Sequence, residues 1–315
     1  MEPAVSIIMP TYNVTRYIGT ALDSLVAQTF QDFEIVIVND SCPDTPALEG
    51  VIERYDNVRY VKQENTGVAG ARNTAVRAAK APFVLNLDPD DWLEPGCLAS
   101  QLSFMQANPE IDVNYINPVY RGGALDGKSW MDVYPSRGAV TFLSVMAGAT
   151  PPANPGSIIR REALLRAGLY DAELRSWEDF GIWLKILKSG GRIAYSDAKL
   201  VNYRIRPGSL TGELRYMDDA VRVLDNVEAL LELTKEEHDA LQKRRASAQL
   251  DRERLRAKSS LQRGDWAGAR KSFEYCLERC PTAKLRVIVA CLKWCPWLMG
   301  GAVRIQDLAR STIRR

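Results

Sequence analysis

Short apolar runs alternate with amphipathic stretches through the first hundred residues. Four of these runs have the length of buried strands: residues 5–9, 34–38, 58–61 and 83–87. Between them, residues 16–29 carry their apolar side chains on one helical face, and residues 68–80 are alanine-rich and helical in pattern. Strands separated by helices of this length predict βαβ units, hence an α/β, Rossmann-like domain with a mainly parallel central sheet. In such a sheet, ligands bind beyond the carboxyl ends of the strands.

The pattern changes in the rest of the chain. Residues 108–160 are rich in Gly, Pro and Asn and show little periodicity, which predicts loops and a few strands around a cleft. From about residue 216 the sequence becomes charged and strongly helical. We therefore predict a first domain over residues 1–215 and a C-terminal helical extension over residues 216–315.

The end of this extension has two interpretations. Residues 285–303 combine apolar side chains and tryptophan with interrupting charges, so they do not form a spanning helix. They could lie on a membrane surface, with arginines near the C-terminus facing anionic lipid. Alternatively, they could pack on the domain or on a second subunit. The first interpretation predicts a peripheral membrane contact through residues 285–315.

Composition narrows the function classes. The 315 residues carry a formal net charge of +2, so nothing global indicates a nucleic-acid partner. The N-terminus lacks a basic region followed by an apolar one, so we expect no signal peptide and a cytoplasmic protein, with at most peripheral contact to the inner face of the membrane. His238 is the single histidine and lies in a charged helical segment. If the protein is an enzyme that moves protons, we expect a carboxylate to do so.

Polar clusters follow the first two apolar runs. Tyr12, within the sequence Pro-Thr-Tyr-Asn at residues 10–13, offers a flat face for a nucleobase; the alternative is a turn with a capping Asn. Asp40 ends the second run, where its carboxylate could accept hydrogen bonds from a uracil N–H or a ribose hydroxyl. The alternative for Asp40 is a turn residue or a helix N-cap.

Two more clusters follow the next runs. Glycines at residues 67–70 allow close backbone approach at the start of a helix, and with Arg72 they would form an anion site for a pyrophosphate. The alternative is a glycine turn with a surface arginine. Asp88, Asp90 and Asp91 place three carboxylates within four residues, which repel one another unless a cation is present. Their hard oxygens favour Mg²⁺ or Mn²⁺; the alternative is a solvated acidic turn.

Together and in this order, these clusters resemble family 2 glycosyltransferases. The matching stretches are residues 5–13, 35–40, 65–73 and 87–91, and the likeness continues in residues 168–171, 177–179 and 203–209. The resemblance covers roughly residues 4–212, about two thirds of the chain. It implies a GT-A fold and an inverting transfer of a sugar from a nucleotide sugar, most often a UDP-sugar, to a hydroxyl of a glycan, lipid-linked or protein acceptor. It also implies a divalent metal ion.

The resemblance assigns roles to individual residues. The donor site would be formed by Pro10, Thr11, Tyr12, Asp40, Gly70, Arg72, Asp88, Asp91 and Arg206. Within it, Thr11, Tyr12 and Asp40 would hold the nucleoside and Arg72 the diphosphate. Asp90 would be the main metal ligand and Asp179 the catalytic base. Trp177 and Glu178 would lie on the acceptor side, with the Trp177 ring stacked on a sugar.

Two departures from the family pattern stand out. Residues 39–42 read Asn-Asp-Ser-Cys in place of paired aspartates followed by Gly-Ser, and Arg206 stands where many relatives have a metal-binding histidine. We expect a bound metal of reduced affinity, with Arg206 on the leaving phosphates. A non-catalytic nucleotide-sugar binder that acts as a scaffold is the alternative in another class. A sugar nucleotidyltransferase is a second enzyme alternative, but the chain lacks the glycine-rich basic loop that class carries after its first strand.

Overall fold

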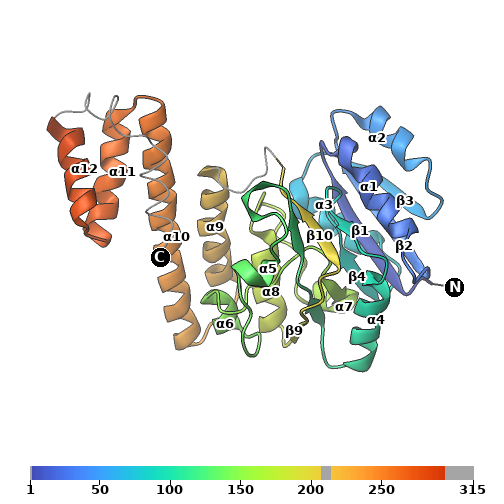
Figure 1. The fold of residues 1–315 in the computed structure, drawn as a ribbon. Coiled ribbons are helices and arrows are strands. Elements are labelled where there is room, and N and C mark those ends of the chain that lie inside the picture. Colours follow the sequence, from blue (N-terminus) through green and yellow to red (C-terminus); the bar gives the residue numbers. More distant parts are fainter. Residues whose placement is uncertain (1, 207–213, 295–315) are drawn as a thin grey trace. The chain divides into compact units, whose positions relative to one another are not determined.

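Strands and helices alternate in the first part of the chain, as the apolar runs predict (Figure 1). This computed structural model describes residues 2–206 and 214–294. The first elements are β1 (Val5–Thr11), α1 (Thr15–Val26), β2 (Phe33–Asp40), α2 (Thr45–Ile52), β3 (Val58–Gln63), α3 (Gly67–Ala78) and β4 (Phe83–Asn86).

The middle of the chain contains more regular structure than its Gly-, Pro- and Asn-rich sequence indicates. Its elements are β5 (Trp92–Leu93), α4 (Cys97–Ala107), β6 (Val113–Tyr115), β7 (Val119–Arg121), a 3₁₀ turn (Gly123–Leu125), α5 (Trp130–Val133), α6 (Phe142–Met146), β8 (Ile158–Arg160), α7 (Arg161–Arg166), α8 (Glu178–Lys188), β9 (Ile193–Tyr195) and β10 (Val201–Arg204). Strands β5 to β8 are only two or three residues long, so periodicity could not reveal them.

A seven-stranded sheet in the order β3-β2-β1-β4-β8-β6-β9 is the centre of this region. β1 pairs in parallel with both β2 and β4, and β2 with β3, whereas β8 runs antiparallel to β4 and β6. A smaller sheet in the order β5-β10-β7 joins the segment after β4 to the segment before residue 206. The predicted α/β fold with a mainly parallel central sheet is therefore confirmed.

Helices cover both faces of the large sheet. Alternate residues of β1 point to opposite faces, so Ile7 packs with α1, α2 and α4, whereas Ile8 packs with α3, α7 and α8. Both side chains are completely buried, and each belongs to a separate apolar cluster. Strands buried on both faces explain why the first four runs are continuously apolar rather than alternating.

The chain divides into two units of internal contacts. One comprises Met1–Ser209 with Arg222–Leu241, and the other Leu210–Val221 with Gln242–Arg315. The helices that follow β10 are α9 (Leu214–Leu230), α10 (Lys235–Gln262), α11 (Trp266–Arg279) and α12 (Ala283–Trp294), so parts of α9 and α10 belong to each unit. The predicted domain boundary between residues 215 and 216 stays a prediction.

The second unit has an apolar core of its own. Leu285, Ile288 and Leu292 of α12 are buried with Phe273 of α11, so the apolar stripe of this helix is used in packing. Trp294 is 72% exposed at the last described position. Residues 295–315, to which part of the predicted membrane contact was assigned, lie outside the described residues. Of the helices described, none combines the length and apolar character needed to cross a bilayer.

Candidate active site

The loops after β1, β2 and β4 open at one edge of the sheet, because these three strands are parallel neighbours. Pro10 and Thr11 are the last residues of β1, not part of a turn, and both are buried. Proline is tolerated there because the pairing of β1 with β4 ends at Ile8. Tyr12, the next residue, is 50% exposed, and Asn13 after it is exposed as well.

Asp40 anchors the start of α3. Its carboxylate is 2% exposed and accepts hydrogen bonds from the backbone N–H groups of Thr66 and Gly67, each at 2.8 Å, and from the Gln63 side chain at 2.8 Å. A carboxylate at a helix N-terminus satisfies unpaired N–H groups and the helix dipole. Asp40 therefore lies against the N-terminus of α3, and the predicted contact between Asp40 and the nucleoside stays a prediction.

The N–H group of Gly67, at the start of α3, donates to the Asp40 carboxylate, and the predicted anion site there stays a prediction. Gly70 lies in the first turn of α3, and a β-carbon at Gly70 would lie 2.2 Å from Thr66 Oγ1. Close packing against Thr66 therefore favours glycine at this position, and its predicted place in the donor site stays a prediction.

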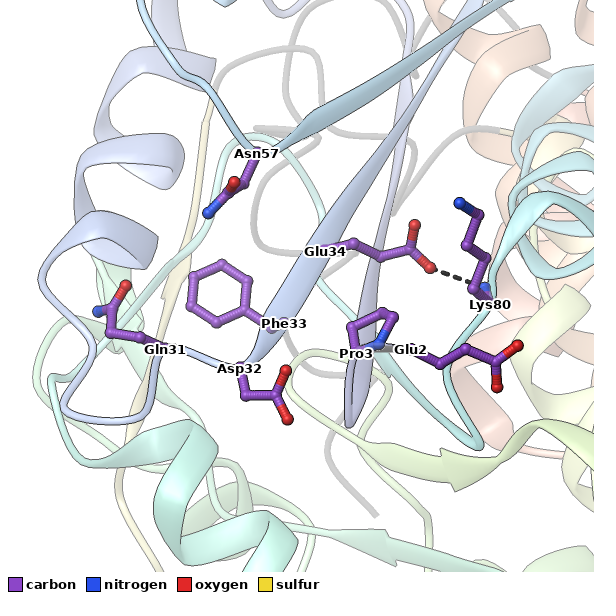
Figure 2. Close-up of a pocket in the computed structure, with 8 residues that line it drawn as sticks. All are labelled: Glu2, Pro3, Gln31, Asp32, Phe33, Glu34, Asn57 and Lys80. Carbon is purple, nitrogen blue, oxygen red and sulfur yellow. Dashed lines mark hydrogen bonds between the residues drawn. The ribbon is translucent and has the colours of Figure 1, made fainter.

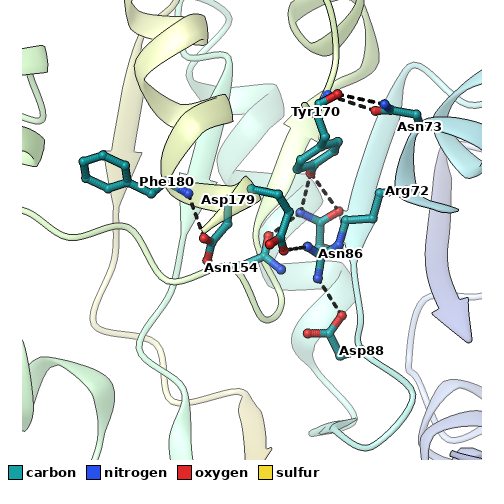
Figure 3. Close-up of polar contacts among 9 residues, drawn as sticks. Arg72, Asn73, Asn86, Asp88, Asn154, Tyr170, Asp179 and Phe180 are labelled. Atoms are coloured by element: carbon teal, nitrogen blue, oxygen red, sulfur yellow. Dashed lines mark hydrogen bonds and ion pairs between the residues drawn. The ribbon is translucent and has the colours of Figure 1, made fainter. Parts of the chain in front are cut away.

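Arg72 is buried between two carboxylates. Its guanidinium is 2% exposed and pairs with Asp88, at 2.7 Å from Nη2 to Oδ1 (Figure 3), and through Nη1 with Glu178. Both terminal nitrogens of the guanidinium are engaged, whereas the buried Nε has no hydrogen-bond partner among the described residues. The predicted contact of Arg72 with the diphosphate stays a prediction. Glu178 is 7% exposed in the same contact, and its predicted place on the acceptor side stays a prediction.

The acidic turn after β4 is lined by arginines from the end of β10. Arg206 Nε donates to Asp90 Oδ2 at 2.6 Å, and the backbone N–H of Arg204 donates to Asp91 Oδ1 at 2.8 Å. Asp91 is 1% exposed, and its predicted place in the donor site stays a prediction. Burial, together with the charges of Asp90 and Asp88, raises the pKa of Asp91 well above its usual range.

Asp90 and Asp88 remain partly accessible. Their side chains are 16% and 27% exposed, and Arg206 is 27% exposed beside them. Burial, followed by the charge of Asp88, raises the pKa of Asp90, which indicates that this carboxylate gains from nearby positive charge. Hard carboxylate oxygens here fit Mg²⁺ or Mn²⁺. Within residues 2–206 and 214–294, no three His, Cys, Asp or Glu side chains gather closely enough to hold a metal alone, so ligand oxygens would have to complete its coordination.

The N-terminus of α8 presents the predicted base. Asp179 is half-buried in the first turn, and its Oδ1 accepts a hydrogen bond from the N–H of Phe180 at 2.7 Å (Figure 3). Burial and then the charge of Glu178 raise the pKa of Asp179 to about 7, while Arg72 acts in the opposite direction. Trp177 precedes this turn in the left-handed backbone region, with φ 62°, and is partly exposed. This strained conformation fixes where α8 begins.

A buried polar network behind these residues was not predicted from the sequence. Asn86 donates to Asn154 Oδ1 at 2.7 Å and to the hydroxyl of Tyr170 at 3.0 Å. Asn73 and Tyr170 exchange two further bonds, from Asn73 Nδ2 to the Tyr170 carbonyl and from the Tyr170 N–H to Asn73 Oδ1. Asn86 was the available signal, since it is a polar residue inside the apolar run at 83–87.

A hollow of about 770 Å³ lies at the other end of the strands (Figure 2). Its lining residues precede or begin β1 to β4: Glu2, Pro3, Gln31, Asp32, Phe33, Glu34, Asn57 and Lys80. Glu34 is held by Ser6 Oγ and by the N–H of Lys80, both at 2.7 Å. The hollow is open and separate from the residues that follow the carboxyl ends, so we assign no chemistry to it.

Comparison with known proteins identifies the family. The sequence profile of glycosyl transferase family 2 matches residues 6–166, about half of the chain. This chain belongs to glycosyltransferase family 2. One relative in the family is the uncharacterized glycosyltransferase EpsJ of Bacillus subtilis, which is 31% identical over 225 residues, covering 67% of this chain and 64% of EpsJ. The chain thus spans less than two thirds of that relative.

Solved structures show the same GT-A fold. TarS 1–349 of S. aureus superposes with a TM-score of 0.64 at 21% identity, covering 99% of this chain and 92% of that one. The same TarS fragment has been crystallised with UDP-GlcNAc and with UDP. The mannosyltransferase PcManGT of Pyrobaculum calidifontis, solved with GDP-Man and Mn²⁺, gives a TM-score of 0.62 at 19% identity, covering 92% of this chain and 79% of that one.

Proposed function

We propose that this family 2 glycosyltransferase moves a sugar from a UDP-sugar to an acceptor hydroxyl with inversion, and that Asp179 is its general base. The observation that carries the proposal is the half-buried Asp179 carboxylate, whose pKa is raised to about 7 at the start of α8. A carboxylate whose pKa is near the working pH is deprotonated in a large fraction of molecules and is still a strong enough base to accept the proton of the acceptor hydroxyl. The TarS complexes with UDP and UDP-GlcNAc support a uridine donor for this fold.

The reaction is a single displacement. The acceptor oxygen forms a bond to the anomeric carbon while the bond from that carbon to the diphosphate oxygen breaks. The acceptor proton passes to a carboxylate oxygen of Asp179, and the electron pair of the broken bond leaves with UDP. In this proposal Tyr12 stacks on the uracil, Asp88 binds the ribose and Arg206 binds the diphosphate; the support is that all three side chains are at least partly exposed. Trp177 lies beside the base, where its ring can contact an acceptor sugar.

A divalent ion would bind at Asp90 and would stabilise negative charge on the departing diphosphate. Arg206 occupies one oxygen of that carboxylate, so ion and guanidinium compete for it. Both are positive, and either favours departure of the nucleotide. We therefore propose that the metal ion binds with reduced affinity, and that the ion and Arg206 together stabilise the negative charge of the diphosphate.

The acceptor is a hydroxyl of a glycan, a lipid-linked glycan or a protein, and we propose that the reaction takes place at the inner face of the membrane. The support for membrane contact is Trp294, exposed beside Lys293 at the end of α12. Flotation with anionic vesicles tests this part. Full-length protein should float and protein truncated after residue 282 should not; equal behaviour would contradict the contact.

A donor panel tests the proposed function directly. Thermal shifts should be measured with UDP-GlcNAc, UDP-glucose and GDP-mannose, with and without Mn²⁺, followed by detection of released nucleoside diphosphate. A ligand at 100 times its Kd should add about 2.7 kcal/mol of stability. Absence of a shift with every nucleotide would refute the donor site. Binding without release, in the presence of a glycan acceptor panel, would favour the non-catalytic binder.

A further inference from the structure

Arg72 connects three separate segments through one buried group. It lies on α3, while Asp88 follows β4 and Glu178 begins α8, 106 positions along the chain. A guanidinium has a planar fork of donors that suits two carboxylates at once. The contact therefore ties the acidic turn on the donor side to the helix that carries Asp179.

The surroundings hold this guanidinium in place. Its central carbon lies 5.7 Å from the centroid of the Tyr170 ring, and Tyr170 is fixed by its paired bonds to Asn73 and by its hydroxyl contact with Asn86 (Figure 3). Side chains locked in this way cannot turn toward a ligand without breaking buried hydrogen bonds. The arrangement indicates that Arg72 holds neighbouring residues of the site in place.

We propose that Arg72 is a positioning residue for the base: by holding Glu178 and Asp88, its buried charge fixes the first turn of α8 and favours the ionised form of Asp179. This inference rests on the proposed function, in which Asp179 accepts the acceptor proton. Glu178 then has a role distinct from that of its neighbour. It binds Arg72 and orients the helix, and does not touch the acceptor.

Charges around Asp179 oppose one another, which makes the inference testable. Glu178 on the same helix and Asp88 after β4 disfavour the ionised form of Asp179, whereas Arg72 on α3 favours it. Tyr170, packed against Arg72, is uncharged, because burial raises its pKa to about 12. The N–H of Phe180 also favours the carboxylate. Removal of Arg72 and removal of Glu178 should therefore shift the titration of Asp179 in opposite directions.

The first experiment follows Asp179 without any substrate. Protein labelled with ¹³C at aspartate carboxyl groups is titrated by NMR, and the Asp179 signal is identified by its loss in Asp179→Asn. Glu178→Gln should lower the midpoint by about one pH unit, and Arg72→Met should raise it by a similar amount. Arg72→Lys keeps the charge and should leave the midpoint close to that of the wild type. If Arg72→Met fails to fold, Glu178→Gln decides the question, and an unchanged midpoint there overturns the proposal.

The second experiment separates positioning from ligand contact. Affinities for UDP and for uridine are measured for the wild type and for Arg72→Lys. Under the proposal, both affinities change by the same factor, whereas a lost diphosphate contact would weaken UDP alone and overturn the proposal. Arg160→Lys is the matched control, because Arg160 is a part-buried arginine that donates to the backbone carbonyls of Ile111 and Met105, away from the site. It should leave the Asp179 midpoint and the ratio of UDP to uridine affinity unchanged.

The two experiments also distinguish this proposal from the proposed function. If no donor is turned over but the opposite shifts of the Asp179 midpoint are seen, the catalytic function fails while the charge arrangement stands. If turnover is seen but Glu178→Gln and Arg72→Met shift the midpoint in the same direction, the role of Arg72 fails while the function stands. With turnover, the acidic limb of the pH–rate profile should move with the NMR midpoint in each variant.

Discussion

Replacement of Asp40 by asparagine distinguishes a structural anchor from a nucleoside ligand. The carboxylate accepts hydrogen bonds from the N–H groups of Thr66 and Gly67 on separate oxygens, each at 2.8 Å. An amide has one acceptor oxygen, so one of these two N–H groups must face an NH₂ group. An unsatisfied buried donor costs about 1–3 kcal/mol, and loss of a negative charge at a helix N-terminus adds about 0.3–1 kcal/mol. We therefore expect Asp40→Asn to destabilise the first unit by about 2–3 kcal/mol.

Thermal melting gives the measurement. For a unit of this size, each kcal/mol lowers Tm by about 2–4 °C, so Asp40→Asn should melt about 4–12 °C below the wild type. Asp56→Asn, an exposed aspartate in a surface turn, is the control and should melt like the wild type. At a temperature where both proteins are folded, Asp40→Asn should still bind UDP. A variant that melts normally but no longer binds UDP would show that the carboxylate contacts the nucleoside after all.

Three further predictions address catalysis, the metal and the division of the chain. Asp179→Asn should keep its affinity for UDP, and its transfer rate should fall by a factor on the order of 10²–10⁴. Near-normal transfer by this variant would place the base elsewhere. In the wild type, the transfer rate should fall as the pH drops below about 7, because protonation of Asp179 removes the base. Arg206→His should bind Mn²⁺ more tightly than the wild type in the presence of UDP. Arg206→Ala should lose more affinity for UDP than for uridine. If Arg206→Ala binds UDP and uridine as tightly as the wild type does, Arg206 points away from the ligand. Truncation after residue 241 should leave a folded first unit that binds UDP, whereas truncation after residue 215 should lose cooperative melting because it removes residues 222–241 of that unit.

The fold was predictable where one local pattern determined it. Strands β1, β2 and β4 are buried on both faces, so their sequences read as continuous apolar runs that end at polar residues. The apolar runs did not predict where each strand ends. The first run stops at residue 9, whereas β1 continues through Pro10 and Thr11. A strand end depends on its neighbours, because β1 pairs with β2 beyond the point where its pairing with β4 stops.

The motifs predicted which positions belong to the candidate site, and the roles of those residues stay predictions. In the structure the side chains of Tyr12, Asp90 and Asp179 are at least partly exposed. The sequence could not show that Arg72 reaches Glu178, because that pairing depends on how α3 and α8 pack on the sheet. A carboxylate at a strand end has the same sequence signal whether it faces a ligand or a helix terminus.

The left-handed backbone of Trp177 has a consequence for attempts to improve this protein. A non-glycine residue in that region carries a cost on the order of 1–2 kcal/mol. Glycine at this position would relieve that cost, yet it would also remove the ring beside the base and free the turn that places Asp179. A screen that selects only for heat resistance would therefore be drawn to position 177 and would enrich variants that are more robust and less active.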